Sequence, residues 1–496
     1  MTTLELLEGL KIKGTDGPLN TVIKGVACNS RLVGKDFLFV AVKGFRVDGH
    51  DYIKDALSRG AAAIVMENAV VEADAKQHAD LNRISFVEVP DSRKALALIS
   101  SAFYGYPSKS LSLVGITGTN GKTTTSFITK SIIEAGGSKA GLIGTISCMT
   151  GERTEVSVNT TPESLDLQRY LKEMVTNKME YAVIEVSSHA LSLDRVEGCS
   201  YKAAVFTNFT QDHLDFHDTM DEYFSTKTRI FDSLAEDGKA VLNMDDPMIR
   251  PLVQKMKRDV VTFGIKSNAM IRAENISNDL NGLSFDVNTP EGGFRIDSKF
   301  MGRFNVYNIL ASIGIAYALG IDEDTIKKGV EAAEPVEGRF EHLDEGQDFL
   351  CIVDYAHTED ALRKLIGEAR LVTKGRVITV VGCGGDRDRG KRPLMGFAAS
   401  ELSDLVYITS DNPRNEDPRK IIEDMVKGIK KENYTVRADR ETAIKEAVSI
   451  AAEGDTVIVA GKGHENYQEI NGERHYFSDK DALRKAIRAC LTEGGK

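Results

Sequence analysis

A glycine-rich segment with one lysine is the part of the sequence best suited to bind phosphate. It consists of Gly118, Thr119, Asn120, Gly121, Lys122, Thr123 and Thr124, between an apolar run, LSLVGI, and an amphipathic stretch, TTTSFITKSIIEAG. Glycines let backbone N–H groups turn toward phosphate oxygens, and the N-terminus of a following helix adds a favourable dipole. We expect Lys122 to neutralise the β- and γ-phosphates of a nucleotide and the Thr123 hydroxyl to bind Mg²⁺.

This segment is the short form GxxGKT of the phosphate loop. Ile116 stands where the longer form has a glycine six positions before the lysine. The alternative interpretation is a tight strand–helix turn with an incidental lysine. The apolar strand before the loop and the amphipathic helix after it favour nucleotide binding.

Two later segments predict a metal site beside this loop. EVSSHAL starts at Glu185 and NFTQDHLDFH spans residues 208–217, and both start where a strand is expected to end. Ligands bind at that edge of open α/β sheets. We therefore expect Glu185 and His213 to join Thr123 around one or two Mg²⁺ ions that clamp phosphate groups. Taken alone, such histidines more often satisfy core hydrogen bonds; their order after a phosphate loop favours the metal site.

The elements that position these residues fall into three blocks. Residues 1–108 contain short strand-like runs between Gly- and Asp-rich turns, and residues 109–336 open with the strand–loop–helix unit. Residues 337–496 follow a Pro- and Gly-containing hinge at 334–341 and again alternate strands with helices. This pattern predicts an α/β fold of three domains. They are a small N-terminal α/β domain, a central domain with a mostly parallel sheet and the phosphate loop, and a C-terminal Rossmann-like α/β domain.

Composition excludes several classes of protein. The 496 residues are 42% hydrophobic and 28% charged, which is ordinary for globular domains, and the formal charge of -11 argues against a general nucleic-acid binder. No apolar stretch approaches the roughly 20 residues of a membrane span, and the N-terminus lacks the plan of a signal peptide. We expect a cytoplasmic protein with neither nucleic acid nor membrane as partner. The cysteines are scattered, without a CxxC pair, which favours a reducing compartment: Cys28, Cys148, Cys199, Cys351, Cys383 and Cys490.

An ordered set of segments resembles the Mur ligase family. They are TGTNGKTTT, NTTPESL, EVSSHALSLDRV, TNFTQDHLDFH, YFSTKTRIF, GRFNVYN, EGRFE, DYAHT, GCGGDRDRGKRP, SDNPRNEDP and AGKGHENYQ. The resemblance runs from about Ser30 to Gln468 and is closest to the members that add diaminopimelate as the third amino acid. It implies an ATP-dependent, Mg²⁺-requiring amide ligase of peptidoglycan precursor synthesis, and we expect a monomer. Its substrates would be UDP-N-acetylmuramoyl-L-alanyl-D-glutamate, meso-2,6-diaminopimelate and ATP.

The resemblance also implies roles for single residues. Catalysis would fall to Lys122, Glu185, His213 and Lys227. By residue type alone Lys227 is a solvated lysine on a helix, but it matches the lysine that in this family carries a carbamate formed with CO2 and binds metal. Such chemistry is plausible because a desolvated lysine has a lowered pKa and becomes nucleophilic.

Binding residues follow from the same match. Nucleotide contacts beyond the loop would be Asn305, Asn308, Arg339, Asp354 and His357. Ser30 of the first domain, which would bind the UDP group, and central-domain residues would contact the UDP-sugar peptide: Asn159, Thr160, Thr161, Ser187 and Arg195. The diaminopimelate pocket of the third domain would be Arg387, Asp411, Asn412, Pro413, Arg414, Gly461 and Glu465. Glu359 replaces a usual proline, and Leu193 stands where some members have a substrate-contacting glutamine.

The chemistry of the acceptor agrees with this pocket. Diaminopimelate ends in both an ammonium and a carboxylate, so Arg414 suits the carboxylate and Glu465 the ammonium. Sister ligases that add lysine or D-glutamate, and folylpolyglutamate synthetases, are the nearest alternatives. A non-catalytic ATP-binding scaffold is another, against which the joint presence of Lys122, Glu185 and Lys227 argues.

Overall fold

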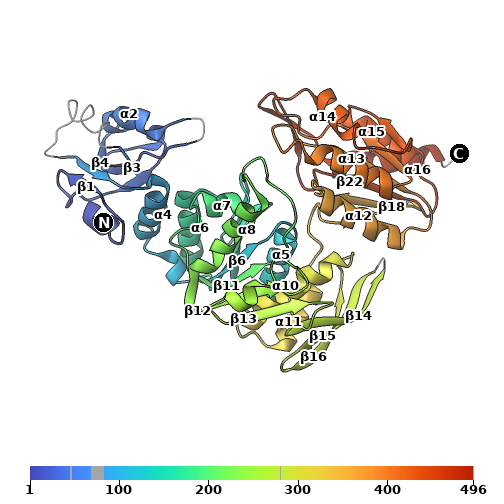
Figure 1. Cartoon of the computed structure of the whole chain (residues 1–496), viewed down its shortest axis with the longest axis horizontal. Helices are drawn as coiled ribbons and strands as arrows, with labels where there is room; N and C mark the ends of the chain where they lie inside the picture. The colour runs from blue at the N-terminus through green and yellow to red at the C-terminus, as the bar shows by residue number, and fades with distance from the viewer. Residues whose placement is uncertain (45–46, 69–82, 280, 495–496) are drawn as a thin grey trace.

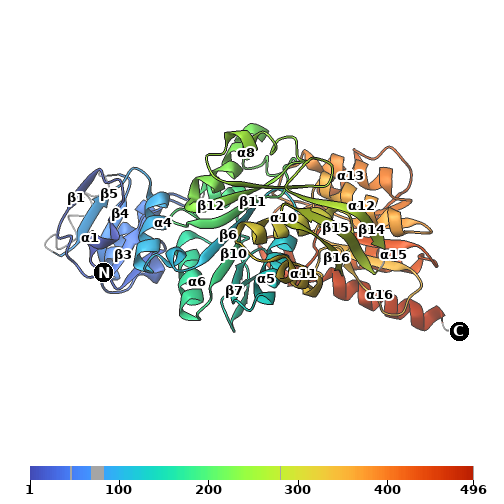
Figure 2. The same cartoon turned by 90° about the horizontal axis from the view of Figure 1, so that it is seen from below.

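The chain forms three α/β units, each with its own main sheet, and the central unit lies between the other two in both views (Figures 1 and 2). The computed structural model describes residues 1–44, 47–68, 83–279 and 281–494. The predicted class, α/β with three domains, is confirmed. Among the described residues no helix combines the length and the apolar character that crossing a membrane requires.

The N-terminal unit is a five-stranded sheet in the order β1-β5-β4-β3-β2. Strands β2 to β5 run parallel, whereas β1 pairs with β5 in the antiparallel sense. The strands are β1 (Gly14–Asp16), β2 (Gly25–Ala27), β3 (Phe37–Val40), β4 (Ala61–Met66) and β5 (Ser85–Glu88). The helices are α1 (Thr3–Leu6), α2 (Ile53–Ser58) and α4 (Ser92–Phe103), with short 3₁₀ helices η1 (Ser30–Leu32) and η2 (Gly49–Tyr52).

The central unit has an eleven-stranded sheet in the order β16-β15-β14-β13-β12-β11-β6-β10-β7-β8-β9. Its middle, from β14 to β7, is parallel, and antiparallel hairpins extend both edges. The strands are β6 (Ser112–Thr117), β7 (Ala140–Ile143), β8 (Ser147–Met149), β9 (Thr154–Val156), β10 (Tyr181–Glu185), β11 (Tyr201–Phe206), β12 (Leu234–Asn243), β13 (Val260–Gly264), β14 (Ile271–Asp279), β15 (Gly282–Thr289) and β16 (Gly292–Ser298).

Helices cover both faces of this sheet, so its central strands are apolar along nearly their whole length. One core contains residues of α5 (Lys122–Ala135), α10 (Phe304–Ala318) and α11 (Glu323–Ala332). The other contains residues of α6 (Ser164–Thr176), α7 (Ser188–Ser192) and α8 (Met220–Thr228). The remaining helices are η3 (Pro107–Lys109), η4 (Arg229–Ser233) and α9 (Leu252–Lys255).

The C-terminal unit is a six-stranded sheet in the order β17-β18-β22-β19-β20-β21, parallel except for β17. Its strands are β17 (Glu341–His342), β18 (Leu350–Asp354), β19 (Val377–Val381), β20 (Leu405–Ile408), β21 (Tyr434–Val436) and β22 (Thr456–Ala460), with a separate hairpin of β23 (Tyr467–Ile470) and β24 (Glu473–Tyr476). Helices α12 (Glu359–Val372), α13 (Lys391–Leu402) and α14 (Pro418–Val426) cover one face; α15 (Arg440–Ser449) and α16 (Asp479–Gly494) cover the other.

The predicted hinge at residues 334–341 lies between the end of α11 and the start of β17. Gly338 has a φ of +65° there, and a Cβ on it would meet the backbone nitrogen of His464 at 2.1 Å. This crossing therefore requires glycine. The predicted boundary after residue 108 falls within η3, and the one after residue 336 within the hinge; both stay predictions.

Candidate active site

The phosphate loop joins β6 to α5, as the sequence predicts, and two of its glycines are required by close packing. Gly118 has a φ of +144°, and a Cβ there would meet the Thr207 hydroxyl at 2.0 Å. Gly121 has a φ of +86°, and its Cβ would meet the side-chain oxygen of Asn308 at 2.2 Å. Both glycines adopt conformations that other residues rarely take. The path of the loop between Thr207 and Asn308 therefore depends on these two glycines.

The residues that follow β11 fix this loop. Strand β11 lies beside β6, so Thr207 and Asn208 emerge at the same edge of the sheet as the loop. The Thr207 hydroxyl donates to the Asn120 carbonyl at 2.7 Å, and the Asn208 amide both donates to that carbonyl and accepts from the Asn120 N–H, each at 2.9 Å. The sequence motif TNFT contained both residues, but sequence reasoning assigned no role to either.

Two lysines, Lys227 buried and Lys122 partly buried, share one carbonyl of the loop. Lys122 Nζ donates to the carbonyls of Gly118 and Thr119 at 2.8 Å each, and Lys227 Nζ donates to the Gly118 carbonyl at 2.9 Å. Lys227 is 1% exposed, so its interpretation as a solvated lysine is wrong. Burial lowers the pKa of both ammonium groups, and the charge of Lys122 lowers that of Lys227 further. A lowered pKa shifts the Lys227 side chain toward its neutral, nucleophilic form.

Glu185 ends β10 and is completely buried beside the loop. Its Oε2 accepts from the Thr123 hydroxyl at 3.0 Å and from the Thr145 hydroxyl at 2.8 Å, and its Oε1 accepts from the Thr145 N–H at 3.0 Å. A Cβ on Gly144 would meet Oε1 at 2.2 Å. The structure thus unites Thr123 and Glu185 as predicted. Sequence reasoning missed Thr145, because nothing in its local motif marks it.

His213 lies in a group of aromatic rings that also contacts Lys227. Its ring packs edge-on against His189, with centroids 4.9 Å apart, and lies 6.1 Å from the ring of Tyr223, over which Lys227 Nζ also sits at 4.8 Å. Burial lowers the pKa of His213 well below its usual range, so the imidazole is neutral. A neutral imidazole is a competent metal ligand.

The predicted metal ligands are four residues of mixed type. Within the part of the chain that the structure describes, no three His, Cys, Asp or Glu side chains are arranged to hold a metal ion. Oxygen ligands are what Mg²⁺ prefers, and the paired oxygens of Thr123 and Glu185 fit that chemistry. His213 would add a nitrogen, and Lys227 would contribute oxygen only after conversion to a carbamate. The four-residue set stays a prediction.

The third domain reaches the loop through two side chains. Arg339 Nη2 donates to the Thr123 hydroxyl at 3.1 Å, its guanidinium lies 4.5 Å from the Tyr355 ring centroid, and its buried Nε has no protein partner among the described residues. Asp360 accepts from the Asn120 side-chain amide at 3.1 Å and from the Thr210 hydroxyl at 3.3 Å. The contact by Asp360, at the start of α12, was not predicted. Arg339 therefore has spare capacity for an anion beside the phosphate loop.

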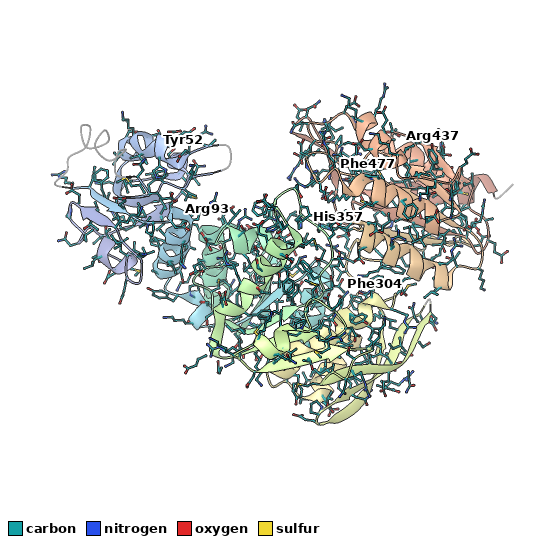
Figure 3. All side chains as sticks on the ribbon, in the orientation of Figure 1. Tyr52, Arg93, Phe304, His357, Arg437 and Phe477 are labelled. Atoms are coloured by element: carbon teal, nitrogen blue, oxygen red, sulfur yellow. The ribbon has the colours of Figure 1, made fainter. Side chains whose placement is uncertain are left out.

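The remaining predicted nucleotide residues line the same junction. His357 lies between the central and third units (Figure 3), with Nε2 4.0 Å from the Asp212 carboxylate, and burial lowers its pKa to about 4. Asp354 is held by the N–H groups of Phe340 and Ala356 at 2.6 and 2.7 Å, while burial raises its pKa. Asn308 donates to Asn305 at 2.8 Å on α10.

Asp212 was not predicted, although it precedes His213 in the sequence. Burial raises the pKa of this carboxyl, but His213, His357 and Lys391 together hold it below its usual value. The third-domain cation Lys391 thus faces a central-domain carboxylate. Glu359, the departure from a usual proline, is the first residue of α12. A proline fits that position, and an acidic side chain there is favoured by the helix dipole.

Four of the predicted UDP-peptide residues form a connected group. The Thr161 hydroxyl donates to the Glu185 carbonyl at 2.8 Å and accepts from the Ser187 N–H at 3.1 Å. Arg195 Nη1 donates to the Thr161 carbonyl at 3.0 Å, and Thr160 and Thr145 hydroxyls lie 3.2 Å apart. Asn159 next to them is exposed, and Ser30 lies in η1 of the N-terminal unit. This group links the predicted substrate loop to the residues around Glu185.

The predicted acceptor residues converge from separate loops of the third domain. Asn412 donates to Glu465 Oε2 at 2.8 Å, and a Cβ on Gly461, where φ is +120°, would meet an Asp411 oxygen at 2.6 Å. Pro413 is buried in the same loop, whereas Arg387 is exposed and donates to the Asp386 carbonyl.

Arg414 and Lys462 complete this group of side chains. Arg414 Nη1 donates to the Gly385 carbonyl at 2.7 Å, and its Nε lies 3.4 Å from Glu469. The guanidinium therefore already bridges two loops. Lys462 is completely buried among the acceptor residues. Sequence reasoning missed it, although it lies inside the quoted motif AGKGHENYQ.

Comparison with known proteins covers all three units. The family models that match are described as Mur ligase family, catalytic domain (residues 22–104), Mur ligase middle domain (116–316) and Mur ligase, glutamate ligase domain (338–463). A UDP-N-acetylmuramoyl-L-alanyl-D-glutamate–2,6-diaminopimelate ligase of Geobacillus thermodenitrificans is 46% identical over 477 residues, 95% of this chain and 96% of its own. The enzyme of that name from Bacillus licheniformis is 44% identical over 494 residues, covering 98% and 99%.

A solved structure of a ligase of that name has a TM-score of 0.67 and 31% identity, and the match covers 99% of both chains. The matches to family and relatives thus extend over the same three units that the sheets define. With its phosphate loop, its lysine pair and its third-domain arginine placed together, the chain belongs to the Mur ligase family.

Proposed function

We propose that the protein is an ATP-dependent ligase that joins meso-2,6-diaminopimelate to UDP-N-acetylmuramoyl-L-alanyl-D-glutamate in peptidoglycan precursor synthesis. The observation that carries this proposal is the convergence of Lys122, the Thr123–Glu185 pair and Arg339 at one edge of the central sheet. Two basic side chains and a pair of oxygen ligands suited to Mg²⁺ at one place support a site that stabilises developing phosphate charge. The names of relatives that match nearly the whole chain support the choice of substrates.

The reaction proceeds in two steps. An oxygen of the substrate carboxylate attacks the γ-phosphorus of ATP, the bond to ADP breaks, and an acyl phosphate forms. The amine of diaminopimelate then attacks the acyl carbon, phosphate leaves with its bridging oxygen, and the nitrogen loses a proton. Lys122 and Arg339 neutralise phosphate charge in the first step, and in-line positioning supplies much of the acceleration.

Mg²⁺, when bound, screens the phosphates and polarises the transferred group. Thr123, Glu185, His213 and Lys227 would hold it, the last as a carbamate formed by attack of its neutral amine on CO2 with loss of a proton. The lowered pKa of Lys227 supports this assignment. The nucleotide would further contact Asn305, Asn308, Asp354 and His357.

The two remaining substrates would bind to two groups of residues, one in the N-terminal and central units and one in the third domain. We assign the UDP-sugar peptide to Ser30, Thr161, Ser187, Arg195 and their neighbours, and diaminopimelate to the third-domain group around Glu465. We also propose that the protein is monomeric and cytoplasmic and that its domain boundaries lie after residues 108 and 336. All six cysteines are free thiols, which supports a reducing compartment.

A lysine-adding enzyme is the second candidate, because Arg414 is already engaged by Gly385 and Glu469. Release of ADP measured with saturating ATP and UDP-dipeptide, and with diaminopimelate, lysine or D-glutamate in turn, decides between them. Diaminopimelate should give the highest kcat/KM. A higher value for lysine or D-glutamate would assign the chain to a sister activity, and amine-independent or absent turnover would contradict a ligase.

A further inference from the structure

The acceptor group of the third domain contains a buried cation without a role in the proposed reaction. Lys462 is 0% exposed. Its Nζ donates to Glu465 Oε2 and to the Asn412 side-chain oxygen at 3.1 Å each, lies 3.8 Å from Asp411, and sits 5.5 Å from the centroid of the Tyr467 ring. A lysine this deeply buried is rare unless its charge is paired.

These contacts hold three chain segments in one geometry. The side-chain oxygen of Asn412 accepts a hydrogen bond from the Glu469 N–H at 3.0 Å as well as the one from Lys462. The side-chain nitrogen of Asn412 donates to Glu465 at 2.8 Å. Lys462 and Asn412 therefore fix the same oxygen of Glu465, and Oε1 of that carboxylate accepts no hydrogen bond from the described part of the chain. Two carboxylates and one ammonium leave the cluster of Asp411, Lys462 and Glu465 with a net charge of about -1 when all are ionised.

We propose that Lys462 is a positioning residue that orients Glu465 as an ionised acceptor for the distal ammonium of the amino-acid substrate. This inference rests on the proposed function and deepens it. The lysine donates to one oxygen of the Glu465 carboxylate and leaves the other oxygen for the substrate. In such a site Glu465 would bind the distal ammonium of the substrate, whereas Arg414 would bind its distal carboxylate.

The electrostatic surroundings of Glu465 explain why a lysine is needed. Burial is the largest cause and leaves the pKa of this carboxyl above its usual value. Asp411 raises the pKa further, whereas the charge of Lys462 and the hydrogen bonds from Lys462 and Asn412 oppose the rise. Loss of the lysine would raise the pKa of the carboxyl further and so favour its protonated form, which does not attract an ammonium. The charged and titratable groups that face Glu465 are Lys462, Asp411, Arg440, Tyr355 and Tyr467.

The test compares Lys462→Met with a matched control. Lys480→Met removes a third-domain lysine that also pairs with two carboxylates, Glu341 and Glu337, near the hinge. We expect Lys462→Met to raise KM for diaminopimelate by about 10-fold or more, with KM for ATP and for UDP-dipeptide changed by less than about twofold. Lys480→Met should leave all three close to the wild-type values.

A probe that lacks the distal ammonium separates positioning from structural support. 2-Aminopimelate retains the distal carboxylate, so its KM, or its inhibition constant if turnover is slow, should be the same for Lys462→Met and wild type. KM for diaminopimelate in Lys462→Met should also fall as pH rises from about 6 to 8.5, because Glu465 regains its charge. Glu465→Gln should show the same rise in KM without that pH dependence, and the double variant should be no worse than either single one.

The inference would be overturned if Lys462→Met weakened the binding of diaminopimelate and 2-aminopimelate equally, or if its KM for diaminopimelate did not change with pH. Lys462 would then only support the structure. An unchanged KM for diaminopimelate would overturn it as well. Lys462→Gln, which keeps a donor but removes the charge, repeats the measurements if the methionine variant does not fold. Failure of the proposed function is a separate result, because wild type would then not release ADP in response to diaminopimelate.

Discussion

Replacing Lys227 with methionine should abolish most activity and yet leave the protein at least as stable. The side chain is buried, and its one hydrogen bond to the described residues goes to the Gly118 carbonyl, which keeps Lys122 Nζ as a second donor at 2.8 Å. No buried acceptor is therefore orphaned by the change. Burying this amine costs free energy because it leaves water, and an apolar side chain of similar volume does not carry that cost.

The stability effect should depend on pH. Burial holds the pKa of Lys227 well below the ordinary lysine value, so the unfolded chain binds a proton that the folded chain does not. That proton favours unfolding between the folded and the unfolded pKa, and wild-type stability rises with pH across this window. We expect the methionine variant to unfold at the same temperature as wild type or a few degrees higher at pH 7, with the difference shrinking toward about pH 10. The comparison uses CO2-depleted buffer.

Activity should fall for a separate reason. Loss of residues that merely support a metal ligand costs about 10–100-fold, so loss of a ligand itself should lower kcat by at least about 100-fold. ADP release measures this, with Lys202→Met, a surface lysine on β11 paired with Asp237, as control. Removing CO2 should slow wild type and not the variant. Near-native turnover of Lys227→Met would refute the carbamate, and a strongly destabilised variant would refute the argument about burial.

Three further outcomes follow from the structure. Gly118→Ala should raise KM for ATP by at least about 10-fold, measured by ADP release, because its Cβ would meet Thr207 at 2.0 Å; an unchanged KM would contradict the packing. Arg414→Ala should cut kcat/KM for diaminopimelate by about 30-fold or more and for lysine much less; equal losses would mean that the arginine only joins loops. Solution scattering should show compaction with an ATP analogue plus UDP-dipeptide, and less with Asp360→Ala, which removes the contact to Asn120; an unchanged radius of gyration would contradict closure.

Local patterns predicted the parts of the site that are continuous in the chain. The strand, loop and helix around Lys122 are confirmed because an apolar run, glycines and an amphipathic run each specify one element. The contact of Thr123 with Glu185 followed from a general rule, since parallel strands β6 and β10 end at the same edge. The three-domain α/β class followed from the alternation of strands and helices.

Local sequence patterns could not predict contacts between segments that are far apart in the chain. Asn120 and Asp360 are 240 residues apart, and their hydrogen bond depends on how two domains meet. The burial of Lys462 likewise depends on three loops of one domain, and a lysine in a glycine-rich turn is ordinarily exposed. The partners of Arg414 could not be predicted either, because this residue has a left-handed φ of +50°, a conformation that arginine rarely adopts. Residue type predicted its chemistry but not its geometry.

The central claim is that a substrate carboxylate is activated by phosphorylation before the amine attacks. UDP-N-acetylmuramoyl-L-alanyl-D-glutamate labelled with ¹⁸O in the reacting carboxylate tests it directly, because the labelled oxygen becomes the bridging oxygen of the acyl phosphate. With ATP, Mg²⁺ and diaminopimelate, mass spectrometry should find one ¹⁸O in the phosphate released for each amide formed from doubly labelled carboxylate. Amide formation with unlabelled phosphate would contradict an acyl phosphate and the account of the site built on it.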